Sequence, residues 1–548
     1  MDLVMFIRND EKGIRDDIVS LSKDVHICTM SKRVFVIYMI INVIVWASIQ
    51  GCTKITYTTD SNSILEFSDD TLMFDSVFTT IGSISLYLSV VNPHDQALLI
   101  NEIELEGGEF SSYRINIDGQ GLDSSGDELV RMEDVTVLPN DSLFIFVEIT
   151  IDPTNTSLAF IDEDRLRFKV NGNDQYVQLI SYGRNAVFHY QPGNWFNSNN
   201  PPDNVLECEE VWNSDLPHVI YGPIRVAPGC SLTIEAGAEV YVHSGSGIWV
   251  QGGSININGT LDEKVVFQGD RLSSSYLDYP GQWGLEFPLE FLYQGENIYY
   301  TVSRGGIWLD RSTNSSINHA IIKNANVGIW VDSIGQGAEY ALQLSNTKIY
   351  NMSSVGLLSQ GGYINGVNNL IADCGEACGA FTLGGKIVMH LSTFANYWVD
   401  GSVRQGSSVY INDWYESAGD IIQHRPFEEG TEFRNCLVWG NNAEANDFDE
   451  LVASLYIPSI YSSPLFTACG VDVQDEDFPN NLLDVNCTTD IAPDFVSIFD
   501  RNFHLNGNST VWQGVSSTPP FNASDVSKDL DGQPRSTFSP DRGCFERQ

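Results

Sequence analysis

Residues 220–270 read IYGPIRVAPGCSLTIEAGAEVYVHSGSGIWVQGGSININGTLDEKVVFQGD, and this stretch decides the fold. Brief alternations of apolar and polar residues, as in Ser231-Leu232-Thr233-Ile234, are separated by Gly, Pro and Ser. Alternation over a few residues favours β-strands, and the Gly, Pro and Ser between the runs favour turns. The stretch therefore predicts short strands joined by turns.

One five-residue segment of this stretch recurs downstream. Gly247-Ile248-Trp249-Val250-Gln251 has counterparts that begin at Gly306, Gly328, Gly356 and Gly379. The steps between the four later copies are 22, 28 and 23 residues. A repeat of this length that contains only strands and turns is typical of a solenoid.

A second register precedes these copies, because apolar runs end in a polar residue at Asn324, Asn351 and Asp373. Such residues tolerate a left-handed backbone and bond neighbouring backbone groups, which suits the corner of a coil. Stacked coils would pair each strand with its counterpart about 4.8 Å away and bury the inward Ile, Val, Leu and Phe in one continuous core. The sequence predicts a right-handed parallel β-helix over residues 205–442.

The sequence outside the repeat predicts further parts. Residues 68–190 contain about seven longer alternating strands, which suggest an immunoglobulin-like β-sandwich. Residues 191–204 are rich in Pro, Asn and Gly and are interpreted as a linker. Residues 443–548 are expected to continue and cap the β-helix, because an open solenoid end is an exposed sheet edge. The predicted fold class is therefore all-β.

The chain is strongly acidic, with a formal net charge of −43. Nucleic acid and anionic lipid surfaces would both be repelled, so the charge argues against them as partners. It also disfavours a polyanionic sugar unless calcium or a local basic patch intervenes. The simplest interpretation of the charge is a well-solvated surface.

The N-terminus carries a targeting signal. Lys32 and Arg33 precede the apolar residues 34–48, which are followed by Gly51-Cys52. This order predicts a signal peptide, with Met30 as the true start and residues 1–51 removed. Gly51-Cys52 resembles the end of a bacterial lipobox, which implies a lipid anchor on Cys52 and a tether over residues 52–67. A plain signal peptide or an uncleaved membrane anchor are the alternatives, although the apolar run is shorter than the roughly 20 residues that a span prefers.

Eight cysteines follow Cys52, and an even number in an exported protein permits disulfides. Connectivity does not follow from sequence; the preferred pairs are Cys208 with Cys230 and Cys469 with Cys487. Cys374 and Cys378 have the wrong spacing for a redox CxxC motif, and no second pair accompanies them at the spacing of zinc ligands.

Several stretches resemble a family of Bacteroidetes-type surface lipoproteins that have an N-terminal immunoglobulin-like domain and a right-handed parallel β-helix. The resemblance implies fold and a place at the outer membrane or cell surface, and it implies no activity. The stretches are Phe74–Thr80, Arg114–Gly119, Asp141–Val147, Val266–Leu272, Pro280–Trp283, Thr393–Trp398, and the closing pattern Asp529–Arg535 with Pro540–Glu546.

β-Helices also host polysaccharide-cleaving enzymes, which carry characteristic catalytic motifs. Of the polygalacturonase motifs only an Asp-Asp pair occurs, and Asp69-Asp70 lies ahead of the β-helix. A lyase needs a basic residue to remove a proton beside the uronate carboxyl, usually near calcium-binding carboxylates, and no such constellation stands out. No catalytic residue is predicted.

Ligand-binding candidates come from the repeat. Asp310 and Asp332 both lie four residues after a repeat Gly, so stacking would place their Cα atoms about 4.8 Å apart. Two such carboxylates share a proton, bind a cation such as calcium, or extend into water. No other cofactor is expected. Trp308 and Trp330, with Trp249, recur at one repeat position and would either stack on sugar rings or pack together.

His390 and Arg404 flank Tyr397 and Trp398, so these four residues either frame a pocket or lie in the core. Three functions remain open. The first is a non-catalytic surface lipoprotein whose β-helix binds a glycan or another surface partner. The second is a polysaccharide lyase or glycoside hydrolase acting on the β-helix groove. The third is a structural surface component.

Overall fold

The computed structural model describes residues 55–79, 83, 85–122, 126–151, 160–190, 204–273, 276–293, 296–398, 404, 406–417, 421–441, 449–461, 465–473, 478–489, 491–507, 512–515, 526–536 and 538–547. The chain has two compact units, residues 1–58 and residues 59–548. The predicted signal peptide and Cys52 lie outside the described residues. In the part of the chain that is described, no helix has the length and apolarity needed to cross a membrane.

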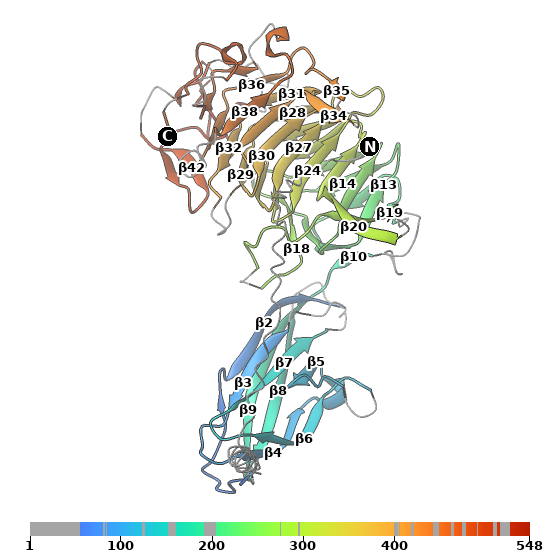
Figure 1. The fold of residues 1–548 in the computed structure, drawn as a ribbon, viewed down its shortest axis with the longest axis vertical. Helices are drawn as coiled ribbons and strands as arrows, with labels where there is room; N and C mark the ends of the chain where they lie inside the picture. Colours follow the sequence, from blue (N-terminus) through green and yellow to red (C-terminus); the bar gives the residue numbers. More distant parts are fainter. Residues whose placement is uncertain are drawn as a thin grey trace, which may run out of the picture. The chain divides into compact units, whose positions relative to one another are not determined.

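The part of the second unit before residue 185 forms two β-sheets around one buried cluster (Figure 1). Alternate residues of each strand enter this cluster, as in β7, where buried and exposed positions strictly alternate. β2 pairs with β9 in parallel, and the other pairings are antiparallel. One sheet holds, in order, β1 (Glu66–Phe67), β3 (Leu86–Val91), β7 (Ser142–Ile149) and β5 (Tyr113–Ile117); the other holds β2 (Thr71–Phe78), β9 (Asn173–Arg184), β8 (Phe160–Val170), β4 (Leu98–Leu105) and β6 (Arg131–Val137).

The remainder of the unit is a stack of coils with three strands each, so the predicted parallel β-helix is confirmed (Figure 1). The β-helix has three sheets, and every neighbouring pair of strands within each sheet is parallel. We call these sheets face 1, face 2 and face 3, in the order in which the chain passes through them within one coil.

Face 1 has ten strands: β10 (Val187–Tyr190), β12 (His218–Tyr221), β15 (Glu239–Val242), β18 (Val265–Gly269), β23 (Ala320–Lys323), β26 (Lys348–Met352), β29 (Leu370–Cys374), β32 (Thr393–Asn396), β37 (Leu437–Gly440) and β40 (Gly470–Val471). Face 2 has eight: β13 (Pro223–Val226), β16 (Gly247–Gln251), β21 (Ile307–Asp310), β24 (Val327–Asp332), β27 (Val355–Gln360), β30 (Ala377–Thr382), β33 (Val409–Asn412) and β38 (Leu451–Ser454).

Face 3 has nine strands: β11 (Glu210–Trp212), β14 (Ser231–Glu235), β17 (Ser254–Asn258), β22 (Ser315–Asn318), β25 (Leu342–Ser345), β28 (Tyr363–Val367), β31 (Lys386–His390), β36 (Glu432–Arg434) and β39 (Phe466–Thr467). Three hairpins lie outside the faces: β19 (Leu285–Tyr293) with β20 (Glu296–Gly305), β34 (Trp414–Ser417) with β35 (Ile421–His424), and β41 (Phe495–Ser497) with β42 (Asn502–Leu505). The helical turns are η1 (Gly108–Phe110), η3 (Pro458–Ile460) and η4 (Asn480–Leu482).

The register predicted from the glycine repeat is confirmed on face 2. Trp308 pairs with Trp330, and Asp310 with Asp332. Trp249 pairs with Trp308 although 59 residues separate them, because the β19–β20 hairpin is inserted between these two coils. The repeat glycines allow close stacking: a Cβ on Gly328 would lie 2.7 Å from the carbonyl oxygen of Gly356, which is too close for any side chain.

The corner residues also behave as predicted. Asn324, Asn351 and Asp373 have φ of 66°, 61° and 49°, in the left-handed region. The Asn351 amide donates to Oδ1 of Asn324 at 2.8 Å, so neighbouring coils are joined by side chains as well as by backbone. The core inside the coils is apolar and closed to water; on face 2 its column includes Ile307, Ile329 and Leu357, each 0% exposed.

Strand pairing extends beyond residues 205–442 at both ends of the β-helix. β10 precedes the segment interpreted as a linker and already pairs with β12 of face 1. At the other end, bridges from Phe466 to Leu483 and from Gly470 to Thr488 extend the coils. The described residues between 491 and 547 then cover the outside of face 1, where Phe503, Trp512 and Phe545 join a buried cluster with strand residues such as Leu370 and Leu437.

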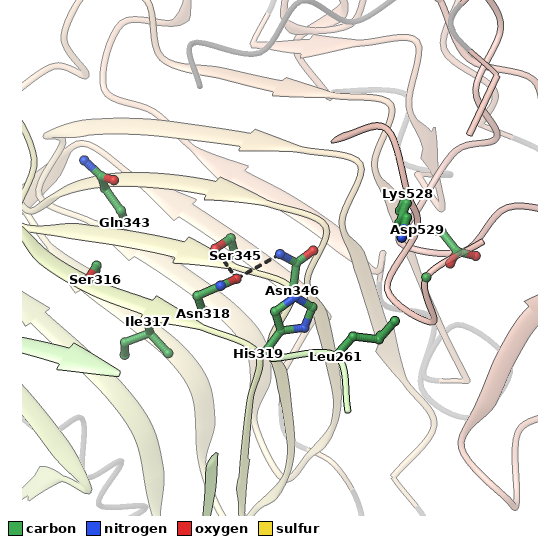
Figure 2. Close-up of a pocket in the computed structure, with 11 residues that line it drawn as sticks. Leu261, Ser316, Ile317, Asn318, His319, Gln343, Ser345, Asn346, Lys528 and Asp529 are labelled. Atoms are coloured by element: carbon green, nitrogen blue, oxygen red, sulfur yellow. Dashed lines mark hydrogen bonds between the residues drawn. The ribbon is translucent and has the colours of Figure 1, made fainter. Parts of the chain in front are cut away.

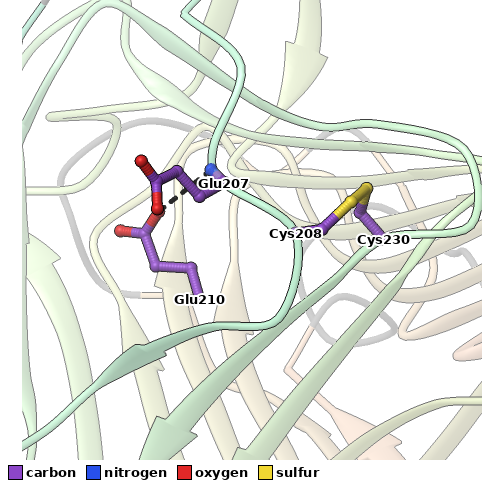
Figure 3. The surroundings of a disulfide bond; sticks show 4 residues. All are labelled: Glu207, Cys208, Glu210 and Cys230. Atoms are coloured by element: carbon purple, nitrogen blue, oxygen red, sulfur yellow. Dashed lines mark hydrogen bonds between the residues drawn. A yellow bond between two sulfur atoms is a disulfide. The ribbon is translucent and has the colours of Figure 1, made fainter.

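The cysteines divide into one disulfide and a set of thiols. Cys208 and Cys230 are joined by a disulfide, which links the segment before β11 to the turn before β14 (Figure 3). The disulfide predicted between Cys469 and Cys487 is absent, because both are free thiols. Their contact is a hydrogen bond from the Cys469 amide to the Cys487 sulfur at 3.3 Å, one step of a stacked column at the coil corner.

Candidate functional site: a polar pocket on face 3

The outward side chains of face 3 are mostly neutral and polar. Strand register stacks Thr233, Asn256, Ser316 and Gln343 in one column that runs from β14 to β25. A second column beside it contains Asn258, Asn318 and Ser345. The inward positions between these columns are Ile and Leu, so the strand alternation that builds the core also displays amides and hydroxyls outside.

A pocket of about 400 Å³ lies where these columns meet the C-terminal segment (Figure 2). One wall comes from β22, β25 and the corners that follow them, and the other from residues far away in the sequence. The lining residues are Ser316, Ile317, Asn318, His319, Gln343, Ser345 and Asn346 on the first wall, and Leu261, Lys528, Asp529 and Gly532 on the second.

Hydrogen bonds fix the first wall. Oδ1 of Asn318 accepts from the Ser345 hydroxyl and from the Asn346 amide, both at 2.9 Å (Figure 2). Oδ1 of Asn346 accepts from the Asn368 amide at 2.7 Å. Because Asn318 uses its oxygen in this way, the network fixes which end of its amide faces outward. Gln343, which is exposed, extends from the neighbouring column toward open solvent.

His319 is the titratable group of the first wall. It sits at the corner after β22 with φ of 49°, and its Nδ1 is buried without a hydrogen-bond partner among the described residues. Burial lowers the pKa of His319, and the nearby positive charge of Lys264 lowers it further. The imidazole is therefore neutral at pH 7, and its unpaired Nδ1 is covered by protein atoms.

Asp529 is the only carboxylate among the lining residues, and its oxygens are occupied. Oδ1 accepts the backbone N–H groups of Asp531 and Gln533 at 3.0 and 2.7 Å, and Oδ2 accepts that of Glu546 at 2.9 Å. The residue is 2% exposed. Asp529 therefore shapes the turn that closes the pocket, and the lining offers no pair of carboxylates for acid–base catalysis.

The tryptophan column predicted from the repeat lies on the outside of face 2. The rings of Trp249 and Trp308 stack with centroids 5.1 Å apart and planes 10° apart. The Arg304 guanidinium lies 5.4 Å from the Trp308 ring and 5.3 Å from the Trp330 ring. Trp330 is 3% exposed and belongs to a buried cluster with Val327 and Val355. This packing favours a structural role over a sugar-stacking platform.

Asp310 and Asp332 neighbour each other at the predicted repeat position. The Arg311 side chain donates to Asp310 from Nε at 2.8 Å and from its terminal nitrogen at 3.1 Å. Burial raises the pKa of Asp332, and the charge of Asp310 raises it further. Among the described residues, no three His, Cys, Asp or Glu side chains converge in a way that could hold a metal ion.

His390, Arg404 and Tyr397 each contact a different part of the chain. His390 is 4% exposed at the end of β31, 3.6 Å from Glu432, and burial lowers its pKa to about 4. Arg404 is instead ion-paired with the buried Glu450, at 2.5 and 2.8 Å. Tyr397 packs against Phe495 and Phe503 of the C-terminal segment.

The sequence analysis missed Asn318, His319 and Gln343. The signal that could have found them is the polar half of the third strand in each coil, in SININ (254–258), SSIN (315–318) and LQLS (342–345).

Comparisons with known proteins identify no relative in sequence. No family model matches the chain, and no curated protein is similar to it. One similar solved structure is a family 123 glycoside hydrolase from Clostridium perfringens, 7% identical, with a TM-score of 0.16 over 22% of this chain and 27% of that one. Another is the periplasmic chaperone SfaE, 15% identical, with a TM-score of 0.14 over 22% of this chain and 57% of that one. Neither shows a family.

Proposed function

We propose that this chain is a surface lipoprotein whose β-helix binds a glycan in the face 3 pocket without cleaving it. In this proposal Cys52 carries the lipid, the two-sheet part is an immunoglobulin-like domain, and the solenoid is right-handed, as nearly all parallel strand crossovers are. The proposed location is the outer membrane or cell surface.

The observation that carries the binding proposal is the composition of the pocket wall. Sugars offer many hydroxyl groups that both donate and accept hydrogen bonds, and amides, hydroxyls and neutral imidazole match them. Asn318, Gln343 and His319 supply these groups from a wall whose backbone is tied into a stacked sheet. Such a wall is preorganised, so little conformational entropy is lost on binding.

The proposal of binding without cleavage is supported by the state of Asp529, the one carboxylate among the described lining residues. A glycosidase needs two carboxylates on either side of the scissile bond, about 5–10 Å apart, and a lyase needs a free base. Asp529 is the one carboxylate in the pocket lining and is held by three backbone N–H groups. A bound glycan would meet hydrogen-bonding groups and the Lys528 ammonium, and no acid–base pair.

The test is a glycan-array screen of the full chain in detergent, followed by affinity measurement on any glycan retained. Gln343→Ala is expected to weaken binding about tenfold, because a ligand hydroxyl loses its partner. Gln360→Ala removes the same amide from the outside of face 2 and should leave affinity unchanged. Equal effects of the two variants, or no retained glycan, would refute the pocket proposal.

The same samples distinguish the enzymatic alternative. Incubation with each retained glycan, with and without calcium, is followed by analysis for shortened products. Release of shortened products by the wild-type chain would contradict the non-catalytic proposal. Release that is abolished by His319→Ala would assign a base to this pocket.

A further inference from the structure

The outside of the four-stranded sheet before the β-helix carries three large aromatic residues. Tyr87 of β3 is 61% exposed, and Phe144 and Phe146 of β7 are 45% and 41% exposed. The residues between them in the chain, such as Leu143 and Ile145, point into the buried cluster. We call Tyr87, Phe144 and Phe146 the aromatic platform.

The three rings are close neighbours on rigid backbone. Tyr87 lies directly opposite Phe146 in the antiparallel register, and its ring centroid is 6.4 Å from that of Phe144. Phe144 and Phe146 are two residues apart on one strand, which separates them by about 7 Å along the sheet. Leu88 and Ile145, on the reverse of these strands, are 0% exposed, so the core holds the platform in place.

The charged groups beside the platform are one solvent-accessible ion pair and one carboxylate. Arg114 of β5 is paired with Glu128 at 2.6 Å, and Glu148 of β7 accepts a hydrogen bond from the Ser85 hydroxyl. Ser89 faces Phe144 across the strands and adds a neutral hydroxyl to the same face. A ligand for this face is therefore uncharged, because a polyanion would also meet the net charge of −43.

The exposed area decides between a protein and a small repeating ligand. At about 200 Å² for a whole aromatic side chain, the exposed fractions of the three residues amount to about 300 Å². A stable protein interface needs about 800 Å² on each partner. The platform is therefore too small for a stable dimer and large enough for a few rings of a linear polymer.

We propose that the aromatic platform binds a neutral polysaccharide by stacking. A sugar ring presents a face of C–H groups with partial positive charge, and these meet the negative face of an aromatic ring. The Ser89 hydroxyl is placed to bond the hydroxyl groups at the rim of such a ring. This site is separate from the face 3 pocket, so it goes beyond the proposed function and does not rest on it.

The experiment measures retardation of the full chain in detergent by native gels that contain β-glucan, xylan, galactomannan or polygalacturonate. We expect retention by at least one neutral polymer. The Phe144→Ala/Phe146→Ala double variant should raise the dissociation constant at least tenfold, and Tyr87→Ala several-fold. Phe144→Leu keeps apolar bulk and removes the ring, so it should also weaken binding.

The matched control is Phe110→Ala, which removes an aromatic ring that is 99% exposed on η1, outside the platform. It should bind as the wild type does, and unchanged melting temperatures would show that all the variants fold. The platform proposal is overturned if the platform variants bind normally or if no neutral polymer retains the wild type. It is also overturned if the variants alter the sedimentation of the protein, and hence its oligomeric state, without altering retention. Gln343→Ala tests the pocket alone, so each proposal can fail without the other.

Discussion

Face 2 and face 3 share one backbone plan and differ in what they display. Both bury a column of Ile and Leu inside the coils, and both repeat in register from coil to coil. Outside, face 2 carries Trp249, Trp308 and Trp330, which pack on one another and on Arg304. Face 3 carries amides and hydroxyls that meet a pocket. In a solenoid the inward column therefore specifies the fold, whereas the outward columns are free to stabilise or to bind.

The largest expected effect tests the part that the two faces share. Ile329→Ala removes a fully buried side chain from the inward column of face 2 and should lower the free energy of unfolding by about 2–5 kcal/mol. Denaturant titration followed by circular dichroism measures the loss. The exposed Gln343→Ala serves as the control, expected within about 0.5 kcal/mol of the wild type. A small loss for Ile329→Ala would mean that the inward column is loosely packed.

The second prediction tests whether the tryptophan column stabilises or binds. Trp330→Ala should cost about 3–5 kcal/mol of stability, because the ring is 3% exposed within a packed cluster. Trp308→Ala should cost less, because that ring is only half-buried. The same denaturant titration compares them. If both variants keep full stability and lose glycan retention, the contrast between the faces is wrong and face 2 is the binding face.

The sequence predicts contacts between residues that occupy the same position in adjacent repeats. It does not predict contacts between residues that are far apart along the chain and share no repeat. The stacking of Trp308 on Trp330 and of Asp310 on Asp332 follows from a repeat of about 22 residues, because strand pairing between adjacent coils is periodic. The pocket instead needs Leu261 and Lys528–Gly532 to meet β22 and β25. Nothing periodic links a residue near 530 to one near 320, so this wall could not be placed from the sequence.

Burial of the tryptophan column was hidden for a similar reason. The exposure of the column depends on Arg304, which belongs to the β19–β20 hairpin inserted between two coils. Because the hairpin is not part of the repeat, the position of Arg304 cannot be predicted from the repeat spacing. The same holds for the aromatic platform. The alternation in β7 predicts that Phe144 and Phe146 share a face, but only the pairing with β3 brings Tyr87 beside them.

The third prediction uses the stacked carboxylates of face 2. The pKa of Asp332 is raised, so the folded chain holds that proton to a higher pH than the unfolded chain does, and stability falls as the pH rises through the folded pKa. Asp332→Asn should remove this dependence and add on the order of 0.5 kcal/mol at pH 7, a small value because the side chain is partly solvated. Asp310→Asn should bring no gain, because it leaves Arg311 without its partner. Unfolding free energies measured from about pH 3.8 upward to pH 8 distinguish the two variants.

Face 3 should respond to pH in the opposite sense. His390 has its pKa lowered to about 4 by burial, so the unfolded chain binds the proton more readily. Stability should therefore decline as the pH falls from about 6.5 toward 4. His390→Asn should flatten the decline within that window and leave the region above pH 7 unchanged. A decline of unchanged size in the variant would assign it to other buried histidines, of which His189, with a pKa lowered to about 3, is the first candidate.

The smallest effect is expected in the pocket, where pH acts on ligand affinity. His319 lines the pocket, and its pKa lies below the ordinary value of 6.5 because of burial and of the charge of Lys264. Glycan affinity should be constant from pH 8 to pH 7 and fall by a few-fold as acidification protonates the imidazole and places a positive charge in the pocket wall. Lys264→Met removes the neighbouring charge, so the fall should begin at a higher pH than in the wild type. An affinity profile that ignores both the pH and Lys264 would remove His319 from the site and leave the amides of face 3 as the only binding groups.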